Sequence, residues 1–241
     1  MSTIEKRRSD AGVPRLTERD LYALKWVAEQ YAVQEDLLQV LLGRLGGHGG
    51  PLNIKTTRKV IDRWRKLELA ERRIIVYGQP SWVWLPKKGL TQLGLDYRSW
   101  TPKLNGLTHT RAVAAVRLQV EEHFPELTWV CERELRHQLS QTQKGEVRPH
   151  LPDAEVRSPG GVGAVEAELT VKSRDRLRRV LTELARRYDR VRYYATEPVR
   201  RILEEPPKGQ VGSPVLHEIE DAARQKITVW PVPDNAEVPF L

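Results

Sequence analysis

The chain has 241 residues, of which 40 are Lys or Arg and 32 are Asp or Glu, so its formal net charge is +8. It has no run of the roughly eighteen apolar residues that a membrane span needs, its first residues lack the apolar segment of a secretory signal, and a single cysteine, Cys131, excludes a disulfide framework and a multi-cysteine zinc site. We therefore expect a soluble, cytoplasmic protein with one large or two small domains.

The N-terminal region predicts a tail and two helices. Residues 1–15 are expected to form a flexible tail. Thr17 can cap the helix that follows, because Asp20 stands at the third position and apolar residues then recur at helical spacing. A second helix is predicted over residues 33–45, and the glycines and proline of residues 46–51 end it.

A third helix, predicted over residues 55–70, has one apolar and one basic face. Two β-rich runs follow at residues 72–77 and 81–86, and the turn residues between them predict a hairpin. Three helices followed by a hairpin is the order of a winged helix-turn-helix, which we expect over residues 16–100. The side chains predicted to be core are Val60, Ile61, Trp64, Leu67, Trp82 and Trp84.

Basic residues are concentrated in the stretch that holds the third helix. Residues 51–100 carry eleven basic and four acidic side chains, whereas residues 1–50 carry seven of each. In a winged helix the third helix enters the major groove and the hairpin touches the flanking backbone, so this charge predicts a DNA partner. The alternative is a solvated basic surface, or a module used for protein contacts. The predicted DNA-binding residues are Lys55, Arg58, Lys59, Arg63, Arg65, Lys66 and Arg73.

A second unit is predicted over residues 107–241, after a linker at residues 101–106. Its first element is a helix over residues 107–123, and the rest mixes strands and helices. The whole chain is therefore expected to belong to the α+β or α/β class. The predicted strands are 127–133, 150–157, 164–171, 191–196 and 226–232, and the predicted helices are 134–148 (or a polar loop), 173–190, 197–205 and 216–225.

Residues 150–172 hold the side chains with the clearest chemistry. Asp153 is predicted in the first strand of a hairpin, and alternation in the second strand puts Glu166, Glu168, Thr170 and Lys172 on one face. Carboxylates so placed can bind Mg²⁺ or Mn²⁺, and such an ion activates water and neutralises the charge that develops on a phosphodiester. The alternative is a charged, solvent-exposed face of an edge strand. The candidate metal ligands are Asp153, Glu166 and Glu168, Lys172 completes the candidate catalytic set, and His109 and His150 are candidate neighbours.

This pattern resembles the PD-(D/E)xK nuclease motif over about residues 107–200, where the predicted order of helix, three strands, helix and strand also matches that family's core. The resemblance implies a restriction-endonuclease-like α/β domain. If Glu166 takes the acidic position, Glu168 stands where the family has lysine. If Glu168 takes it, Thr170 stands there and Lys172 lies one step further along the same face. Whether the site cleaves DNA is left open by these departures.

The chain as a whole resembles the replication-relaxation protein family of plasmids and integrated mobile elements. The resemblance is carried by the N-terminal winged helix, the run LTHTRAVAAV, the PDA triplet, and the run VEAELTVKS with a basic helix after it that ends near a tyrosine. It implies a role in replication or DNA transfer. The matching residues are His109, Pro152, Asp153, Glu166, Glu168, Lys172, Ser173 and Tyr188.

Several functional hypotheses follow. The first is a metal-dependent DNA endonuclease or nickase, and the second is a non-catalytic replication or regulatory factor on a degenerate nuclease fold. A third is an assembly subunit that recruits a protein partner through the C-terminal stretch 206–241, and the paired half-sites that winged helices read make a homodimer plausible. A relaxase using Tyr188, Tyr193 or Tyr194 is disfavoured, because no three-histidine cluster accompanies these tyrosines.

Overall fold

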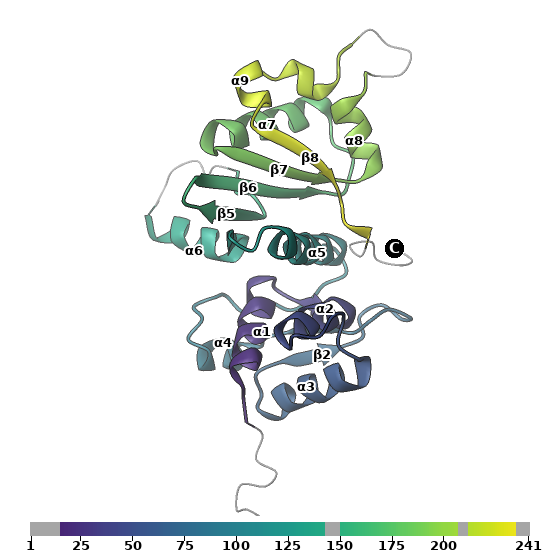
Figure 1. The fold of residues 1–241 in the computed structure, drawn as a ribbon, viewed down its shortest axis with the longest axis vertical. Coiled ribbons are helices and arrows are strands. Elements are labelled where there is room, and N and C mark those ends of the chain that lie inside the picture. The colour runs from purple at the N-terminus through teal and green to yellow at the C-terminus, as the bar shows by residue number, and fades with distance from the viewer. Residues whose placement is uncertain (1–14, 143–149, 207–211, 235–241) are drawn as a thin grey trace, which may run out of the picture.

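The computed structural model describes residues 15–142, 150–206 and 212–234 (Figure 1). The N-terminal helices form one end of the molecule, a five-stranded sheet forms the other, and α5 (Leu107–His123) lies between them. The predicted tail lies outside the described residues except for Arg15, as do parts of the predicted 134–148 element and of the stretch 206–241.

The N-terminal unit combines helices with a small antiparallel sheet of order β1-β3-β2. The three predicted helices and the two hairpin strands are all found. Strand β1 was not predicted, because its two residues pair with β3 from far along the chain. The hairpin strands are shorter than the predicted runs. The elements are α1 (Glu18–Glu29), β1 (Val33–Gln34), α2 (Glu35–Leu45), α3 (Ile54–Lys66), β2 (Glu71–Arg73), β3 (Trp82–Trp84) and α4 (Lys87–Gln92).

Asp20 joins the start of α1 to α3. The predicted capping box is confirmed: the Thr17 hydroxyl accepts from the Asp20 N–H at 3.2 Å, and the Asp20 carboxylate accepts from the Thr17 N–H at 2.8 Å. The same fully buried carboxylate accepts hydrogen bonds from Arg63 at 2.5 Å and from the indole of Trp64 at 3.1 Å. Because a buried charge is tolerated only when it is paired and hydrogen-bonded, this cluster fixes how the two helices meet.

The interior of the N-terminal unit is apolar and rich in tryptophan. Trp64, Trp82 and Trp84 are at most 2% exposed, so their predicted place in the core is confirmed. On α3 the buried residues are Thr57, Val60, Ile61 and Trp64, and Leu67, just after the helix, is half-buried against the same core. The other face of α3 is left to its charged side chains, as the helical spacing predicts.

Helix α5 packs against both units. Ala112, Ala115 and Leu118 are buried in the core of the N-terminal helices, whereas Val116 and Val120 are buried against the sheet of the C-terminal unit. Small alanine side chains allow neighbouring helices to approach closely. The helix predicted over residues 107–123 is therefore shared by the two units.

The C-terminal unit is built on a mixed sheet of order β4-β5-β6-β7-β8. Strands β4, β5 and β6 are antiparallel neighbours, and β6, β7 and β8 are parallel. Val165 packs with α5 while its neighbour Ala164 packs with α7, so the two helices cover opposite faces of the sheet. The elements are β4 (Thr128–Cys131), α6 (Glu132–Thr142), β5 (Ala154–Ser158), β6 (Gly161–Glu168), α7 (Arg174–Arg187), β7 (Arg190–Ala195), α8 (Glu197–Glu204), η1 (Val215–Glu218), α9 (Asp221–Arg224) and β8 (Ile227–Pro231).

Two boundaries differ from the prediction where they affect the candidate site. Asp153 precedes β5 instead of lying within it, and β6 ends at Glu168 instead of continuing to residue 171. The side chain of Glu168 accepts hydrogen bonds from the N–H and hydroxyl of Thr170, which turns the chain away from the sheet. Thr170 and Lys172 therefore do not continue the strand face. The predicted helix 216–225 is likewise divided into η1 and α9.

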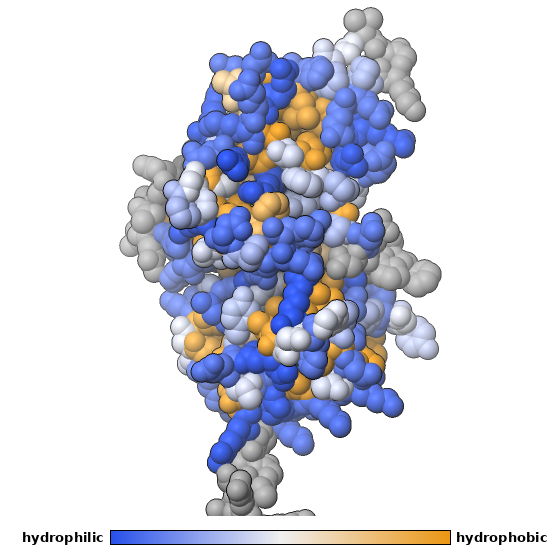
Figure 2. All heavy atoms as spheres, in the orientation of Figure 1, coloured by the Kyte–Doolittle hydropathy of each residue, from blue (hydrophilic) through white to orange (hydrophobic). Residues whose placement is uncertain are grey.

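Within the described residues, no helix has the length and apolar character needed to cross a membrane. The face of the molecule drawn in Figure 2 is mostly hydrophilic, and hydrophobic atoms reach the surface there in separate patches. This distribution agrees with apolar side chains that pack mainly between the layers of the fold.

Candidate functional site

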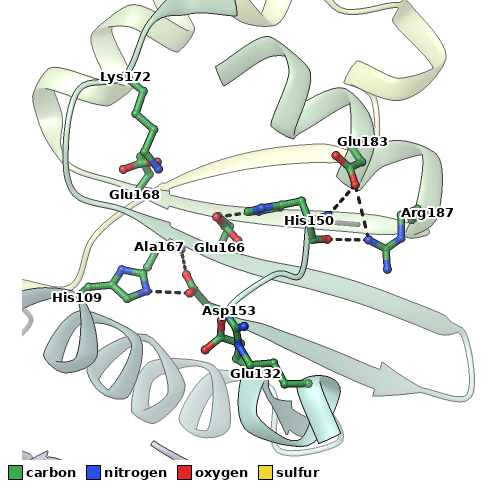
Figure 3. Close-up of polar contacts among 11 residues, drawn as sticks. His109, Glu132, His150, Asp153, Glu166, Ala167, Glu168, Lys172, Glu183 and Arg187 are labelled. Carbon is green, nitrogen blue, oxygen red and sulfur yellow. Dashed lines mark hydrogen bonds and ion pairs between the residues drawn. The ribbon is translucent and has the colours of Figure 1, made fainter. Parts of the chain in front are cut away.

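Asp153 lies where α5, β5 and β6 meet. The pairing of Ala154 with Val165 brings Asp153 beside the end of β6. Its Oδ2 accepts a hydrogen bond from the backbone N–H of Ala167 at 2.8 Å, and its Oδ1 pairs with Nε2 of His109 at 2.8 Å. The sheet thus holds one carboxylate oxygen, and the first turn of α5 holds the other (Figure 3).

Glu166 presents a second carboxylate next to Asp153, and it is only 8% exposed. Its Oε1 pairs with Nε2 of His150 at 3.1 Å, while its Oε2 is buried without a hydrogen-bond partner in the described part of the chain. Burial raises the pKa of Glu166 to about 7, the charge of Asp153 adds to this rise, and His150 opposes it. A buried oxygen without a partner is energetically costly, so a cation beside it would be stabilised.

Two histidines flank the carboxylates, as Figure 3 shows. Burial opposes protonation of His109, but the hydrogen bond and the charge of Asp153 outweigh it and raise its pKa to about 9. The hydrogen bond to Glu166 raises the pKa of His150. Both histidines therefore contact the candidate carboxylates, and the raised pKa of His109 favours its protonated form.

Residues that the sequence analysis did not single out hold His150 in place. The backbone N–H of His150 donates to Glu183 at 2.9 Å, and its carbonyl accepts from Arg187 at 2.6 Å. Glu183 and Arg187 stand one turn apart on α7. In the sequence, the spacing of four residues between an acidic and a basic residue is the one weak indication that these two side chains interact. The packing of α7 on the sheet brings both side chains to His150, and their spacing along the helix does not specify this contact.

Glu168 and Lys172 form a pair at the end of β6. The ammonium of Lys172 contacts Oε2 of Glu168, and Thr170 donates to Oε1. Glu168 is 5% exposed, so its charge is compensated inside the protein. The predicted set of Asp153, Glu166, Glu168 and Lys172 is thus gathered at one end of β6 (Figure 3), but Lys172 is held by Glu168 and not by the other two.

The nuclease resemblance implies a Mg²⁺ or Mn²⁺ ion, and the carboxylates of Asp153 and Glu166 are the groups that could hold it. Among the described residues, no group of three Asp, Glu, His or Cys side chains is arranged to hold a metal ion. Mg²⁺, however, usually binds proteins through one or two carboxylates and completes its coordination with water and substrate phosphates. Asp153 and the unpartnered oxygen of Glu166 fit that mode.

The predicted DNA-binding residues lie mainly on the outer face of α3. Most of these side chains are exposed, although Arg58 reaches Glu35 at 3.3 Å and Arg65 reaches Asp62 at 3.4 Å. Arg63 differs, because its guanidinium pairs with the buried Asp20. The exposed members are Lys55, Arg58, Lys59, Arg65 and Lys66 on α3, together with Arg73 on β2.

The loop between β2 and β3 carries exposed apolar and aromatic side chains. Tyr77 is 99% exposed and Ile74 is 64% exposed. Figure 1 shows that α3 and β2 lie at the end of the molecule away from β6, with α5 between them. The basic face and the carboxylate site are therefore separate surfaces.

In comparisons with known proteins, no family model, curated protein or solved structure matches this chain.

Proposed function

We propose that this chain is a DNA-binding protein of a plasmid or mobile element that cleaves or nicks DNA with Mg²⁺ or Mn²⁺ bound at Asp153 and Glu166. The order α1, α2, α3, β2, β3 supports a winged helix-turn-helix for the N-terminal unit. The order α5, β4, α6, β5, β6, α7, β7, with α6 between the first two strands, supports the restriction-endonuclease-like fold that the PD-(D/E)xK resemblance implies.

One observation carries the proposal. Asp153 stands beside Glu166, whose Oε2 is buried without a partner and whose pKa is raised to about 7. A surface carboxylate on an edge strand would be hydrated and would keep an ordinary pKa. A carboxyl pair held in this state favours a cation site over the alternative of a solvated charged face.

The chain's own groups have distinct parts in this proposal. Asp153 and Glu166 would hold the ion, and a bound ion would supply the positive charge that polarises a phosphodiester and lowers the pKa of water. The carboxylate of Glu168, beside the ammonium of Lys172, takes the proton of the attacking water. Attack of the water oxygen forms a new P–O bond and breaks the bond to the leaving sugar oxygen, which takes a proton from solvent water.

Relaxation of a supercoiled plasmid tests the proposal. In Mg²⁺ or Mn²⁺ the wild-type chain is expected to produce nicked or linear DNA. The variants Asp153→Asn and Glu166→Gln keep the size of each side chain but remove its charge. Each is expected to slow the reaction about 100-fold or more, the scale on which removal of one group that stabilises a transition state acts.

The matched control is Glu122→Gln, which alters an exposed glutamate of α5 that pairs with Arg44 outside the site. This variant is expected to cleave at the wild-type rate, and removal of the metal by a chelator is expected to stop cleavage in both. Equal cleavage by wild type, Asp153→Asn and Glu166→Gln would contradict the proposal.

A second candidate function is a non-catalytic DNA-binding factor on a degenerate nuclease fold. Two pairings favour it: the ammonium of Lys172 contacts Glu168, and the carboxylate of Asp153 is paired with His109. Lys172 is therefore not placed beside Asp153, where the nuclease motif would have its lysine. Calorimetric titration with Mn²⁺ separates the two functions. Absence of Mn²⁺ binding together with strong, salt-dependent DNA affinity would select this second function.

A further inference from the structure

A groove of about 820 Å³ lies between the end of α1, the segment that follows α4, and α6. Its size is that of a ligand site. One acidic side chain, Asp96, is among its lining residues, whereas aromatic and cationic side chains dominate. The aromatic residues are Tyr31, Tyr97 and Trp100, and the exposed cations are Arg98, Lys103 and Arg136.

The aromatic wall of the groove is held rigidly. The buried guanidinium of Arg133 stacks 4.6 Å from the ring of Tyr31 and 4.7 Å from that of Tyr97. It also donates to the carbonyls of Ala28 and Arg98, each at 2.5 Å. A wall fixed in this way loses little conformational entropy when a ligand binds.

Tyr31 has a left-handed backbone conformation at the end of α1, and its ring lies against Trp100. Its φ is 65°, in the left-handed region that bulky residues rarely adopt. Its ring lies 5.4 Å from that of Trp100, at an interplanar angle of 56°. Because Tyr31 directly follows the C-cap of α1, where a left-handed residue commonly ends a helix, this conformation sets the direction in which its ring leaves the helix.

The groove adjoins the carboxylate site. Tyr31 lines both the groove and a smaller cavity of about 60 Å³ whose other walls include His109 and Asp153. The Tyr31 hydroxyl donates to Glu132 at 3.0 Å, and Arg136 of the groove pairs with the same carboxylate at 2.5 Å. A strand held in the groove would therefore lie on the other side of Tyr31 from the cavity that Asp153 lines.

We propose that this groove binds a nucleotide unit of single-stranded DNA, with a base stacked on Trp100 and phosphates held by Arg98 and Lys103. Aromatic platforms beside cations are the means by which proteins hold single strands, and the bases of a duplex are not free to stack on them. The inference deepens the proposed function, because it makes an unpaired strand the form of DNA that reaches Asp153. Binding itself does not depend on cleavage.

Fluorescence anisotropy on the full chain tests whether the groove binds single-stranded DNA. The titrations contain a chelator, so that no DNA is cut. The probes are a thymidine oligonucleotide of about twelve nucleotides and a duplex of the same length. Arg98→Ala/Lys103→Ala and Trp100→Leu are each expected to weaken single-strand binding about tenfold and to leave duplex binding unchanged. Trp100→Phe retains a stacking ring and is expected to bind like wild type.

The charge-matched control is Lys25→Ala/Lys87→Ala, which removes two exposed cations outside the groove. Unchanged single-strand affinity in Arg98→Ala/Lys103→Ala, or an equal loss in the control pair, overturns the inference. If Trp100→Leu fails to fold by circular dichroism, the Arg98 and Lys103 pair decides the question.

Binding of free deoxythymidine monophosphate shows whether the groove recognises a DNA strand or a single free nucleotide. Binding of the monophosphate as tight as that of the oligonucleotide would overturn the assignment to a strand. Because binding is measured without metal and cleavage with it, the groove and the nuclease proposal fail independently. Loss of cleavage in Asp153→Asn with intact strand binding supports both.

Discussion

At the scale of single residues, Glu166 is a buried carboxyl whose protonation is linked to folding. Burial, with the charge of Asp153, raises its pKa from 4.5 to about 7, so the folded protein binds a proton that the unfolded chain has released. This contribution to stability is fully present below a pH of about 4.5 and is lost as the pH rises through about 7. A bound cation would remove the cost of ionising the carboxyl.

Glu166→Gln isolates this contribution, because glutamine resembles the protonated carboxyl. Without metal, the free energy of unfolding of the variant relative to wild type is expected to rise between pH 4.5 and 7, the interval of the shifted pKa. Urea unfolding in a chelator at several pH values measures it. Glu122→Gln serves as the control with no such trend, and a difference independent of pH for Glu166→Gln would show that the carboxyl is not perturbed.

At the scale of elements, α3 presents a basic face on a helix whose other face is anchored in the core. Thr57, Val60, Ile61 and Trp64 are buried, so substitutions of exposed lysines on this helix alter charge with little effect on packing. This separation lets DNA binding be tested without loss of the fold.

Lys59→Ala/Lys66→Ala is expected to weaken duplex binding and to reduce the slope of log affinity against log salt by about 0.9 for each phosphate that the protein no longer neutralises. Anisotropy titrations of duplex DNA at several salt concentrations measure the slope. The pair Lys25→Ala/Lys87→Ala removes the same charge elsewhere and is expected to leave the slope unchanged. Equal slopes in all three proteins would refute the assignment of α3 as the DNA face.

At the scale of the whole molecule, α5 joins the two units through both packing and charge. Arg111, which is 4% exposed, donates to Asp36 at 2.6 and 2.9 Å and to the fully buried Gln34 at 2.5 Å. The opposite side of the helix packs on the sheet through Val116. We therefore expect the units to unfold together.

Arg111→Ala leaves the buried Gln34 side chain without this donor and removes the ion pair to the partly exposed Asp36, so it is expected to lower the free energy of unfolding by about 2 kcal/mol. Hydrogen exchange is expected to show an equal loss of protection in the amides of α3 and of β6, because the cores of both units are packed on α5. The exposed Arg178→Ala is the control and should change neither. Loss of protection confined to the N-terminal unit would show that the units unfold separately.

Much of the local structure could be predicted because its causes lie within a few residues. The capping box of Thr17 and Asp20 depends on a spacing of three residues, and it is present. The buried face of α3 follows from helical periodicity. The closeness of Asp153 and Glu166 follows from a short turn between two paired strands, and that part of the candidate site is found as predicted.

Other features depend on segments that are distant along the chain. His109 reaches Asp153 from 44 residues away, and strand β1 exists only because Val33 pairs with Val83. The predicted strand through Thr170 and Lys172 was wrong, because alternation alone does not show where hydrogen bonding to a neighbouring strand stops. Arg63 was assigned to a DNA surface by its place on α3, yet its guanidinium is paired with the buried Asp20.

The sequence by itself therefore determined the order of most helices and strands, β1 and the division of residues 216–225 excepted, together with the basic face of α3 and the nearness of two carboxylates. Each of these follows from periodicity, charge and turn chemistry over short spans. Only the tertiary structure decided that Glu166 is buried with one oxygen unpartnered, that Lys172 pairs with Glu168, and that an aromatic, cationic groove adjoins the site. The physical reason is that burial and pairing depend on which distant segments exclude water from a side chain, and local spacing does not specify those segments.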